Sequence, residues 1–190
     1  MKIQFENVSF RYESRKEAES VSTLNFTIAS GEFILICGPS GSGKSTIGRI
    51  INGLAPNFYR GALTGKVLLD GIDITTIPQA ELAGSIGSVF QNPRTQFFDT
   101  NSTGELAFGC ENMGYPARKI KERVHRASQE FGLENLLDRD IFNLSGGEKQ
   151  KIACGSIYAV NPDVYVFDEP SSNLDFISIN ELAEIMQKLK

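Results

Sequence analysis

The sequence has little histidine and cysteine, and it lacks any long apolar run. Its one histidine, His125, lies in a basic run with helical spacing, and we assign it no catalytic role. The three cysteines are widely spaced and form no Cys-x-x-Cys pair, which argues against a disulfide framework or a zinc site. No stretch approaches the ~18 apolar residues of a membrane span, and the first residues alternate instead of forming a signal peptide. We expect a soluble, cytosolic chain.

The charge is slightly acidic, with 19 Lys plus Arg against 23 Asp plus Glu, a net charge of −4. This balance argues against a protein that binds nucleic acid or anionic membrane by charge alone. The length of 190 residues suits about one ordinary globular domain, without disulfides or metals. Its 18 glycines exceed the number expected at the average of ~7%, so the positions of the glycines matter.

Hydrophobic periodicity divides the chain into strand-like and helix-like segments. Residues 33–37 form a continuous apolar run between two glycines, which predicts a strand buried on both faces. From about residue 102 to 160 the pattern becomes helical. Further strands are predicted at 3–10, 21–28, 66–69, 86–90 and 164–167, with a turn at 13–20 between the first two, and helices at 46–54, 78–83, 103–110, 117–131, 134–137, 148–160 and 177–189.

A phosphate-binding loop is predicted between residues 33–37 and the helix that follows. The segment matches Gly-x4-Gly-Lys-Ser/Thr and is followed by a threonine; its residues are Gly38, Pro39, Ser40, Gly41, Ser42, Gly43, Lys44, Ser45 and Thr46. Glycines let backbone N–H groups surround a β-phosphate, Lys44 supplies a positive charge, and the Ser45 hydroxyl is a ligand for Mg²⁺. The alternative is a glycine-serine loop with an incidental lysine.

Two adjacent acids, Asp168 and Glu169, follow the apolar strand predicted at 164–167. Asp168 is placed to hold Mg²⁺, and Glu169 to orient and deprotonate an attacking water. Taken alone, such a pair could equally be a simple turn.

A second glycine-rich element consists of Ser145, Gly146, Gly147 and Glu148 at the start of a predicted helix. Ser145 and Glu148 have the spacing of a capping box, so a well-capped helix is one interpretation. Capping does not require two consecutive glycines, and exposed N–H groups at a helix start can bind an anion. We therefore predict a second anion site, for a phosphate that the Lys44 loop leaves partly exposed.

Together, the Lys44 loop, the Leu144-Ser-Gly-Gly sequence, the Asp168-Glu-Pro sequence and residues 171–175 resemble the nucleotide-binding domain of ATP-binding-cassette (ABC) proteins. The resemblance runs from Lys2 to the end of the chain. It implies an α/β fold of the P-loop NTPase type, with an opening antiparallel β subdomain, a mostly parallel sheet and a helical signature subdomain. The helical subdomain is expected at about 92–160, and the core at 1–91 and 161–190.

The resemblance also implies roles for single residues. Tyr12 would stack on adenine, although it could instead be a core aromatic at a strand end. Gln91 would be catalytic, touch Mg²⁺ and mark the contact with a transmembrane coupling protein. Asp175 would lie in the D-loop. The implied cofactors are ATP and Mg²⁺, the latter held by Ser45, Gln91 and Asp168. A second cassette would pack head-to-tail, with Ser145, Gly146, Gly147 and Glu148 facing the partner's ATP, at the cytoplasmic face of the membrane.

A finer resemblance lies in Gln91-Asn-Pro-x-x-Gln96 and the later Phe108-Gly-x-Glu-Asn112, which look like ATPases of energy-coupling-factor importers for cobalt, nickel and vitamins. Residues 54–65 resemble members that carry two cassettes in one chain. The implied function is ATP hydrolysis that drives import. One alternative is a DNA-repair or ribosome-associated clamp, but the acidic net charge argues against contact with nucleic acid. The other is a fragment that binds ATP without efficient turnover.

The sequence departs from the family pattern at its C-terminal end. The family's switch histidine follows the D-loop helix, whereas the chain ends at Lys190 and has only His125 far upstream. We therefore expect a truncated cassette with weak ATPase activity.

Overall fold

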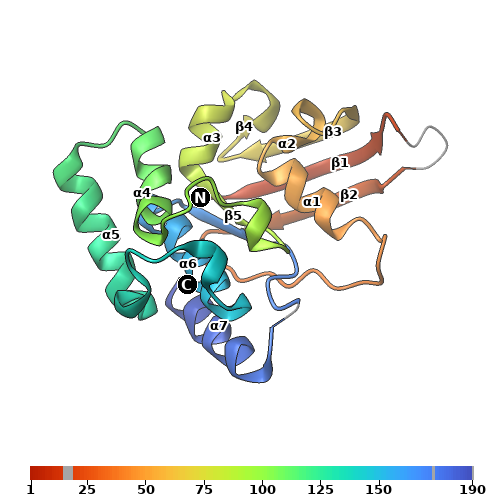
Figure 1. Cartoon of the computed structure of the whole chain (residues 1–190). Coiled ribbons are helices and arrows are strands. Elements are labelled where there is room, and N and C mark those ends of the chain that lie inside the picture. Colours follow the sequence, from red (N-terminus) through yellow and green to blue (C-terminus); the bar gives the residue numbers. More distant parts are fainter. Residues whose placement is uncertain (15–18, 173, 190) are drawn as a thin grey trace. The chain divides into compact units, whose positions relative to one another are not determined.

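The computed structural model describes residues 1–14, 19–172 and 174–189. They form two compact units, residues 1–86 and 87–189, and each is described by itself. The first unit, shown in Figure 1, contains β1 (Ile3–Tyr12), β2 (Val21–Ile28), α1 (Lys44–Ile51), α2 (Leu54–Asn57), β3 (Gly61–Leu69), β4 (Ile72–Asp73), the 3₁₀ turn η1 (Ile74–Thr76) and α3 (Gln79–Ser85).

The sheet of the first unit is antiparallel and has the strand order β2-β1-β3-β4. The buried residues of β1 are Ile3, Phe5, Val8 and Phe10, which follow the predicted period of two on each side of Asn7 but not across it. A register shift interrupts the pairing of β1 with β3 near Asn7, which has a φ of 51°. Gly65 lies opposite, where a Cβ atom would be 2.3 Å from the Asn7 carbonyl oxygen. Only glycine allows this close approach.

The second unit is mainly helical. It contains most of β5 (Ile86–Val89), then η2 (Pro93–Thr95), α4 (Ser102–Asn112), α5 (Ala117–Phe131), η3 (Glu134–Leu136), η4 (Ile141–Asn143), α6 (Gly146–Val160), β6 (Val164–Phe167) and α7 (Phe176–Lys188). Strands β5 and β6 form a two-stranded sheet. The core lies among the helices and includes Leu106, Phe131, Ile152 and Leu182. The α/β class is confirmed, as are the helices expected between residues 102 and 160.

The strand expected at residues 33–37 is wrong. Neither sheet of the described residues includes this run, and its side chains are exposed, with Leu35 at 76% and Phe33 at 56%. A buried strand needs a hydrogen-bonded neighbour on each edge, and neither sheet supplies one here. The turn expected at 13–20 lies partly outside the described residues, because 15–18 are among those not described.

Gly87 on β5 lies at a close approach between the small sheet and α6. A Cβ atom there would lie 2.2 Å from Cγ2 of Ile157 and 2.8 Å from Cγ of Pro162. Both neighbours are stiff, one because it is β-branched and the other because of its ring. The strand and α6 can therefore pack this closely only over a glycine.

We expect Gly87→Ala to lower the free energy of unfolding by about 2 kcal/mol, because the added methyl group overpacks a rigid contact. Urea denaturation measures this loss. The double variant Gly87→Ala/Ile157→Ala should lose less than the sum of the two single losses, because Ile157→Ala removes the clashing methyl. Strict additivity would contradict the contact.

Candidate functional site

The Lys44 loop, residues 38–43, is exposed and precedes α1 in the first unit. Gly41 and Gly43 have φ angles of 80° and 95°, in the left-handed region that favours glycine. A Cβ atom on Gly43 would also lie 2.4 Å from the carbonyl oxygen of Ser20. Gly41 and Gly43 are thus required by the backbone shape of the loop.

Helix α1 begins at Lys44 without a side chain to cap it. Its N-cap residue is Gly43, which makes no side-chain hydrogen bond, and the first turn contains no acid. The positive end of the helix therefore faces the loop without a compensating carboxylate, as an anion site requires. The Lys44 ammonium donates to the carbonyl oxygens of Gly38 at 3.0 Å and Pro39 at 3.1 Å. Ser45 and Thr46 follow in the first turn, and Thr46 is buried.

Tyr12, at the end of β1, is fixed to α1 through its hydroxyl group. Its oxygen lies 3.1 Å from Oγ1 of Thr46 and accepts from the Arg49 guanidinium at 2.9 Å. The Phe10 ring packs edge-on at a centroid distance of 4.8 Å. The ring of Tyr12 is half-buried and is therefore held in one orientation beside the helix that carries the Lys44 loop.

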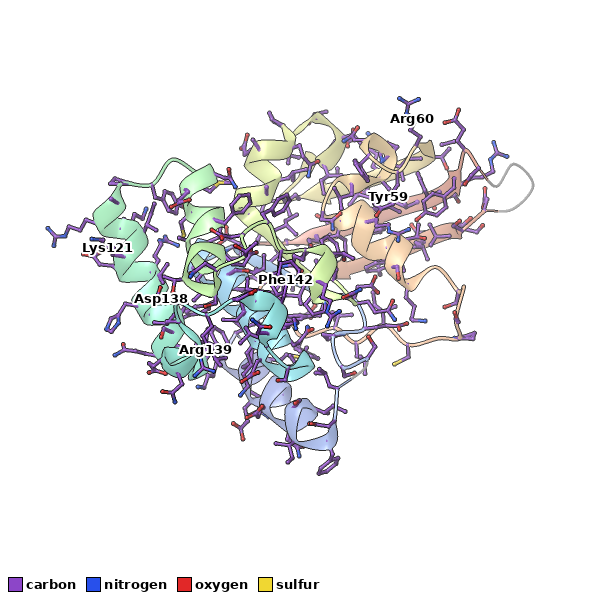
Figure 2. The ribbon with its side chains drawn as sticks, viewed as in Figure 1. Tyr59, Arg60, Lys121, Asp138, Arg139 and Phe142 are labelled. Atoms are coloured by element: carbon purple, nitrogen blue, oxygen red, sulfur yellow. The ribbon has the colours of Figure 1, made fainter. Side chains whose placement is uncertain are left out.

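A cavity of about 560 Å³ lies next to Tyr12 within the first unit. Tyr12 and two arginines, Arg11 and Arg60, line it together with Glu13 and Pro56. Figure 2 labels Arg60 and its neighbour Tyr59 at this part of the unit. The Arg49 guanidinium lies over the Tyr59 ring, 4.1 Å from its centroid. Tyr12 thus combines an aromatic face with a neighbouring cavity, which a planar base requires.

The two acids lie in the second unit, directly after β6. The Asp168 N–H donates to the Val89 carbonyl oxygen at 3.0 Å, which extends the β5–β6 pairing by one residue. Glu169 follows with a φ of 46°, immediately before Pro170. This conformation is uncommon for a residue with a side chain, and backbone strain of this kind clusters at functional sites.

Gln91 lies beside Glu169, although the two are 78 residues apart in sequence. Its amide Nε2 donates to Oε2 of Glu169 at 3.1 Å. The Ser172 hydroxyl donates to the Gln91 carbonyl oxygen at 3.4 Å, so the backbone of Gln91 is held as well as its side chain. The structure thus brings together the two side chains that the sequence predicts as catalytic.

The second glycine-rich element forms the start of α6. The Ser145 side chain accepts from the Glu148 N–H, and the Glu148 carboxylate accepts from the Ser145 N–H at 2.7 Å. This is the capping box that the spacing indicates. The hydrogen bonds from Ser145 are the main reason why the pKa of Glu148 lies below its ordinary value of 4.5. Gly146 is exposed at the first helical position.

Gly147 has a packing reason to be glycine. A Cβ atom there would lie 2.3 Å from Oγ of Ser178 in the first turn of α7. Asp175 caps α7 by accepting from the Ser178 N–H at 2.8 Å, and this bond holds the pKa of Asp175 below its ordinary value. Asn173, in the expected D-loop at 171–175, lies outside the described residues. The second glycine therefore serves the contact between α6 and α7, and an anion is not needed to explain it.

The profile of the ABC transporter family matches residues 21–172 of this sequence. This range spans the Lys44 loop, Gln91, the start of α6 and the two acids. The chain belongs to the ABC transporter family.

Curated relatives of this ABC chain are named as transporter ATP-binding proteins. A Treponema denticola protein named as an ABC transporter ATP-binding protein is 45% identical over 188 residues, which cover 99% of this chain and 38% of the relative. The energy-coupling factor transporter ATP-binding protein EcfA1 of Ureaplasma parvum is 39% identical over 188 residues, 99% of this chain and 62% of its own. The chain thus spans well under half of the first of these relatives.

Two solved structures share the fold of this ABC chain. The structure of CbiO1 from Clostridium perfringens, part of the ABC transporter complex CbiONQ, has a TM-score of 0.85 at 29% identity and covers 98% of this chain and 72% of its own. A bacterial Atm1-family ABC exporter with ATP bound has a TM-score of 0.78 at 28% identity, covering 99% and 32%. The P-loop NTPase fold type of the ABC family is thereby confirmed.

Three polar residues support the site of the ABC chain, although the sequence motifs give no indication of this role. Arg49 holds the Tyr12 hydroxyl. Lys149 is buried and donates to the carbonyl oxygens of Phe142 and Leu144, and burial lowers its pKa. Glu105 is buried and accepts the backbone N–H groups of Phe98 and Asp99. Sequence patterns cannot mark such residues, because charged side chains in helices normally face solvent.

The described residues of the ABC chain contain no cluster of three or more His, Cys, Asp or Glu side chains that could hold a metal by themselves. Any metal bound here would need hydroxyl, amide or ligand oxygens to complete its coordination. Among the described helices, none is both long enough and apolar enough to cross a membrane.

The capping box at α6 should make stability depend on pH. Because the folded pKa of Glu148 is below 4.5, its contribution is complete above that pH and is lost as the pH falls through the folded value. The residue is partly exposed, so we expect about 0.5 kcal/mol after solvent screening. Urea denaturation from about pH 6 to pH 3 measures this, and Glu148→Gln should remove the pH-dependent part while keeping an acceptor. An identical pH profile for both proteins would contradict it.

Proposed function

We propose that this ABC chain binds Mg·ATP at the Lys44 loop and hydrolyses it with Glu169 as the general base, to drive import through a membrane partner. The observation that carries the proposal is the hydrogen bond of 3.1 Å between Gln91 Nε2 and Glu169 Oε2. It orients the carboxylate that follows β6, in a backbone conformation that a non-glycine residue rarely adopts. A simple turn would not require both this hydrogen bond and the positive φ of Glu169.

The geometry of the first unit supports nucleotide binding. The uncapped N-terminus of α1 and the left-handed glycines present backbone N–H groups to an anion. Lys44 would exchange its two carbonyl contacts, to Gly38 and Pro39, for the β- and γ-phosphates. Tyr12, held by Thr46 and Arg49, would present its ring to the adenine base beside the same helix.

The second unit would supply the residues of the hydrolytic step. Glu169 would accept the proton of the attacking water, and Gln91 would fix the direction of the carboxylate through its amide. Each unit has oxygen groups of the kind that Mg²⁺ prefers: the Ser45 hydroxyl in the first, and the Gln91 amide and the Asp168 carboxylate in the second. A bound Mg²⁺ would supply charge neutralisation at the phosphates.

The start of α6 supports a role toward a second cassette. Its exposed Gly146 and its capped N-terminus present the positive end of a 15-residue helix to solvent. We infer that this end, with Ser145, Gly147 and Glu148, contacts the ATP of a partner cassette in a head-to-tail dimer. The segment at Gln91 would contact a transmembrane coupling protein at the cytoplasmic face of the membrane. The likeness to EcfA1 and CbiO1 favours the energy-coupling-factor type.

Lys44→Ala should weaken Mg·ATP binding at least tenfold, because it removes charge-assisted hydrogen bonds to the phosphates. Isothermal titration calorimetry measures the affinity. Lys66→Ala, which removes an exposed lysine from β3 of the same unit, is the matched control and should bind as the parent does. Equal affinity of Lys44→Ala and the parent would show that the phosphates bind elsewhere.

Glu169→Gln should abolish hydrolysis while it preserves ATP binding, because the amide keeps the shape of the carboxylate but accepts no proton. In size-exclusion chromatography with ATP, the variant of the whole protein should accumulate as a dimer of cassettes. For the 190 residues themselves we expect slow turnover, because the one histidine, His125, lies on α5 and none is available near Glu169 for the switch role. Steady-state phosphate release measures the hydrolysis rate of the variant and of the 190 residues. Fast hydrolysis by Glu169→Gln would rule out Glu169 as the general base.

Affinity purification of the tagged whole protein from detergent-solubilised membranes tests the transport role. We expect a polytopic membrane protein to co-purify. Salt-sensitive recovery of DNA or ribosomes in its place would contradict import.

A further inference from the structure

Glu105 is a buried carboxylate to which the proposed reaction gives no task. It lies in the first turn of α4 and is only 3% exposed. Among the described residues, no lysine or arginine forms an ion pair with it. A buried, unpaired carboxylate is costly unless hydrogen bonds compensate for its lost hydration. Burial raises the pKa of Glu105, which reflects that cost.

The compensation comes from the backbone of the Gln91 segment, residues 90–99. Oε2 of Glu105 accepts the N–H groups of both Phe98 and Asp99, each at 2.9 Å. The Phe98 ring also stacks on Phe108 of α4, with centroids 4.6 Å apart. The C-terminal end of the segment is therefore attached to α4 by a carboxylate and an aromatic pair.

The attachment continues toward Gln91 through short side-chain hydrogen bonds. Gln96 accepts the Phe90 N–H at 3.1 Å, which closes residues 90–96 into a loop. Asn92 accepts the Arg94 N–H at 3.1 Å and caps the 3₁₀ turn η2 inside that loop. Residues 98 and 99 come two positions after this closed loop, so the chain connects the Glu105 contact to Gln91 through a segment held by its own hydrogen bonds.

We propose that Glu105 is a positioning residue for the Gln91–Glu169 pair, acting through the backbone of residues 98 and 99. This inference rests on the proposed function of Gln91 and Glu169. Without the carboxylate acceptor, two backbone N–H groups lose their partner, and the segment leaves α4. The amide of Gln91 then no longer fixes the carboxylate of Glu169. A misplacement of about 1 Å at a catalytic group can cost up to ~100-fold in rate.

The test compares Glu105→Ala and Glu105→Gln in steady-state ATP hydrolysis by the whole protein. Glu105→Ala should lower kcat about tenfold or more and change KM for ATP less than about twofold, since the Lys44 loop is untouched. Glu105→Gln retains an oxygen acceptor of the same reach and should keep most of the activity. Cys110→Ala removes a buried side chain of the same helix without touching the segment, so it should lower the melting temperature and leave kcat unchanged.

A spectroscopic readout separates failure of this inference from failure of the proposed function. The sequence has no tryptophan, so Phe98→Trp adds one reporter to the segment. In this background, Glu105→Ala should lower the fluorescence anisotropy of the tryptophan, and Glu105→Gln should not. If the parent lacks ATPase activity while the anisotropy falls, the attachment is right and the proposed function is wrong. Unchanged anisotropy, or unchanged kcat in an active parent, would overturn the inference.

Discussion

The pairing of β5 with β6 is the constraint on which the second unit depends. These short strands lie side by side, and the bond from the Asp168 N–H to the Val89 carbonyl oxygen continues the pairing past the end of β6. Gln91 follows one strand and Glu169 the other, so the pairing brings together side chains from distant parts of the sequence. The contact between Gln91 and Glu169 thus depends on strand register, and Gly87 lets α6 pack closely against β5.

Two helix N-termini carry the glycine-rich motifs, and the structure treats them differently. Helix α1 has a glycine N-cap, no side-chain cap and no acid in its first turn, so its positive end lacks internal compensation. Helix α6 has a complete capping box, and Glu148 already places a carboxylate at its first turn. The first end has no internal compensation for its positive charge, which is consistent with the triphosphate that we propose for it. The second end is already satisfied internally, so the partner contact that we propose for it would rely on the N–H groups outside the box and on the helix dipole.

The motifs, most of the helices and the antiparallel sheet could be predicted from the sequence, because each depends on local patterns. The loop at Lys44 depends on backbone angles that only glycine adopts readily, and the helices of the second unit on a period of 3.6. The strand at residues 33–37 could not be predicted in this way. Hydrophobicity indicates what a segment would bury, but burial also requires neighbouring strands, and neither sheet places one beside this run.

The polar residues that hold the site could not be predicted either, for a different reason. Glu105 and Lys149 are charged residues on helices, and sequence patterns assign such residues to the exposed face. In the structure each is buried against backbone groups of opposite partial charge. The Glu105 carboxylate accepts from the N–H groups of residues 98 and 99, and the Lys149 ammonium donates to the carbonyl oxygens of residues 142 and 144. These segments lead to Gln91 and to Ser145. Irregular backbone near a site has unpaired polar groups that a helix or sheet would satisfy, and a buried charge satisfies two of them at once.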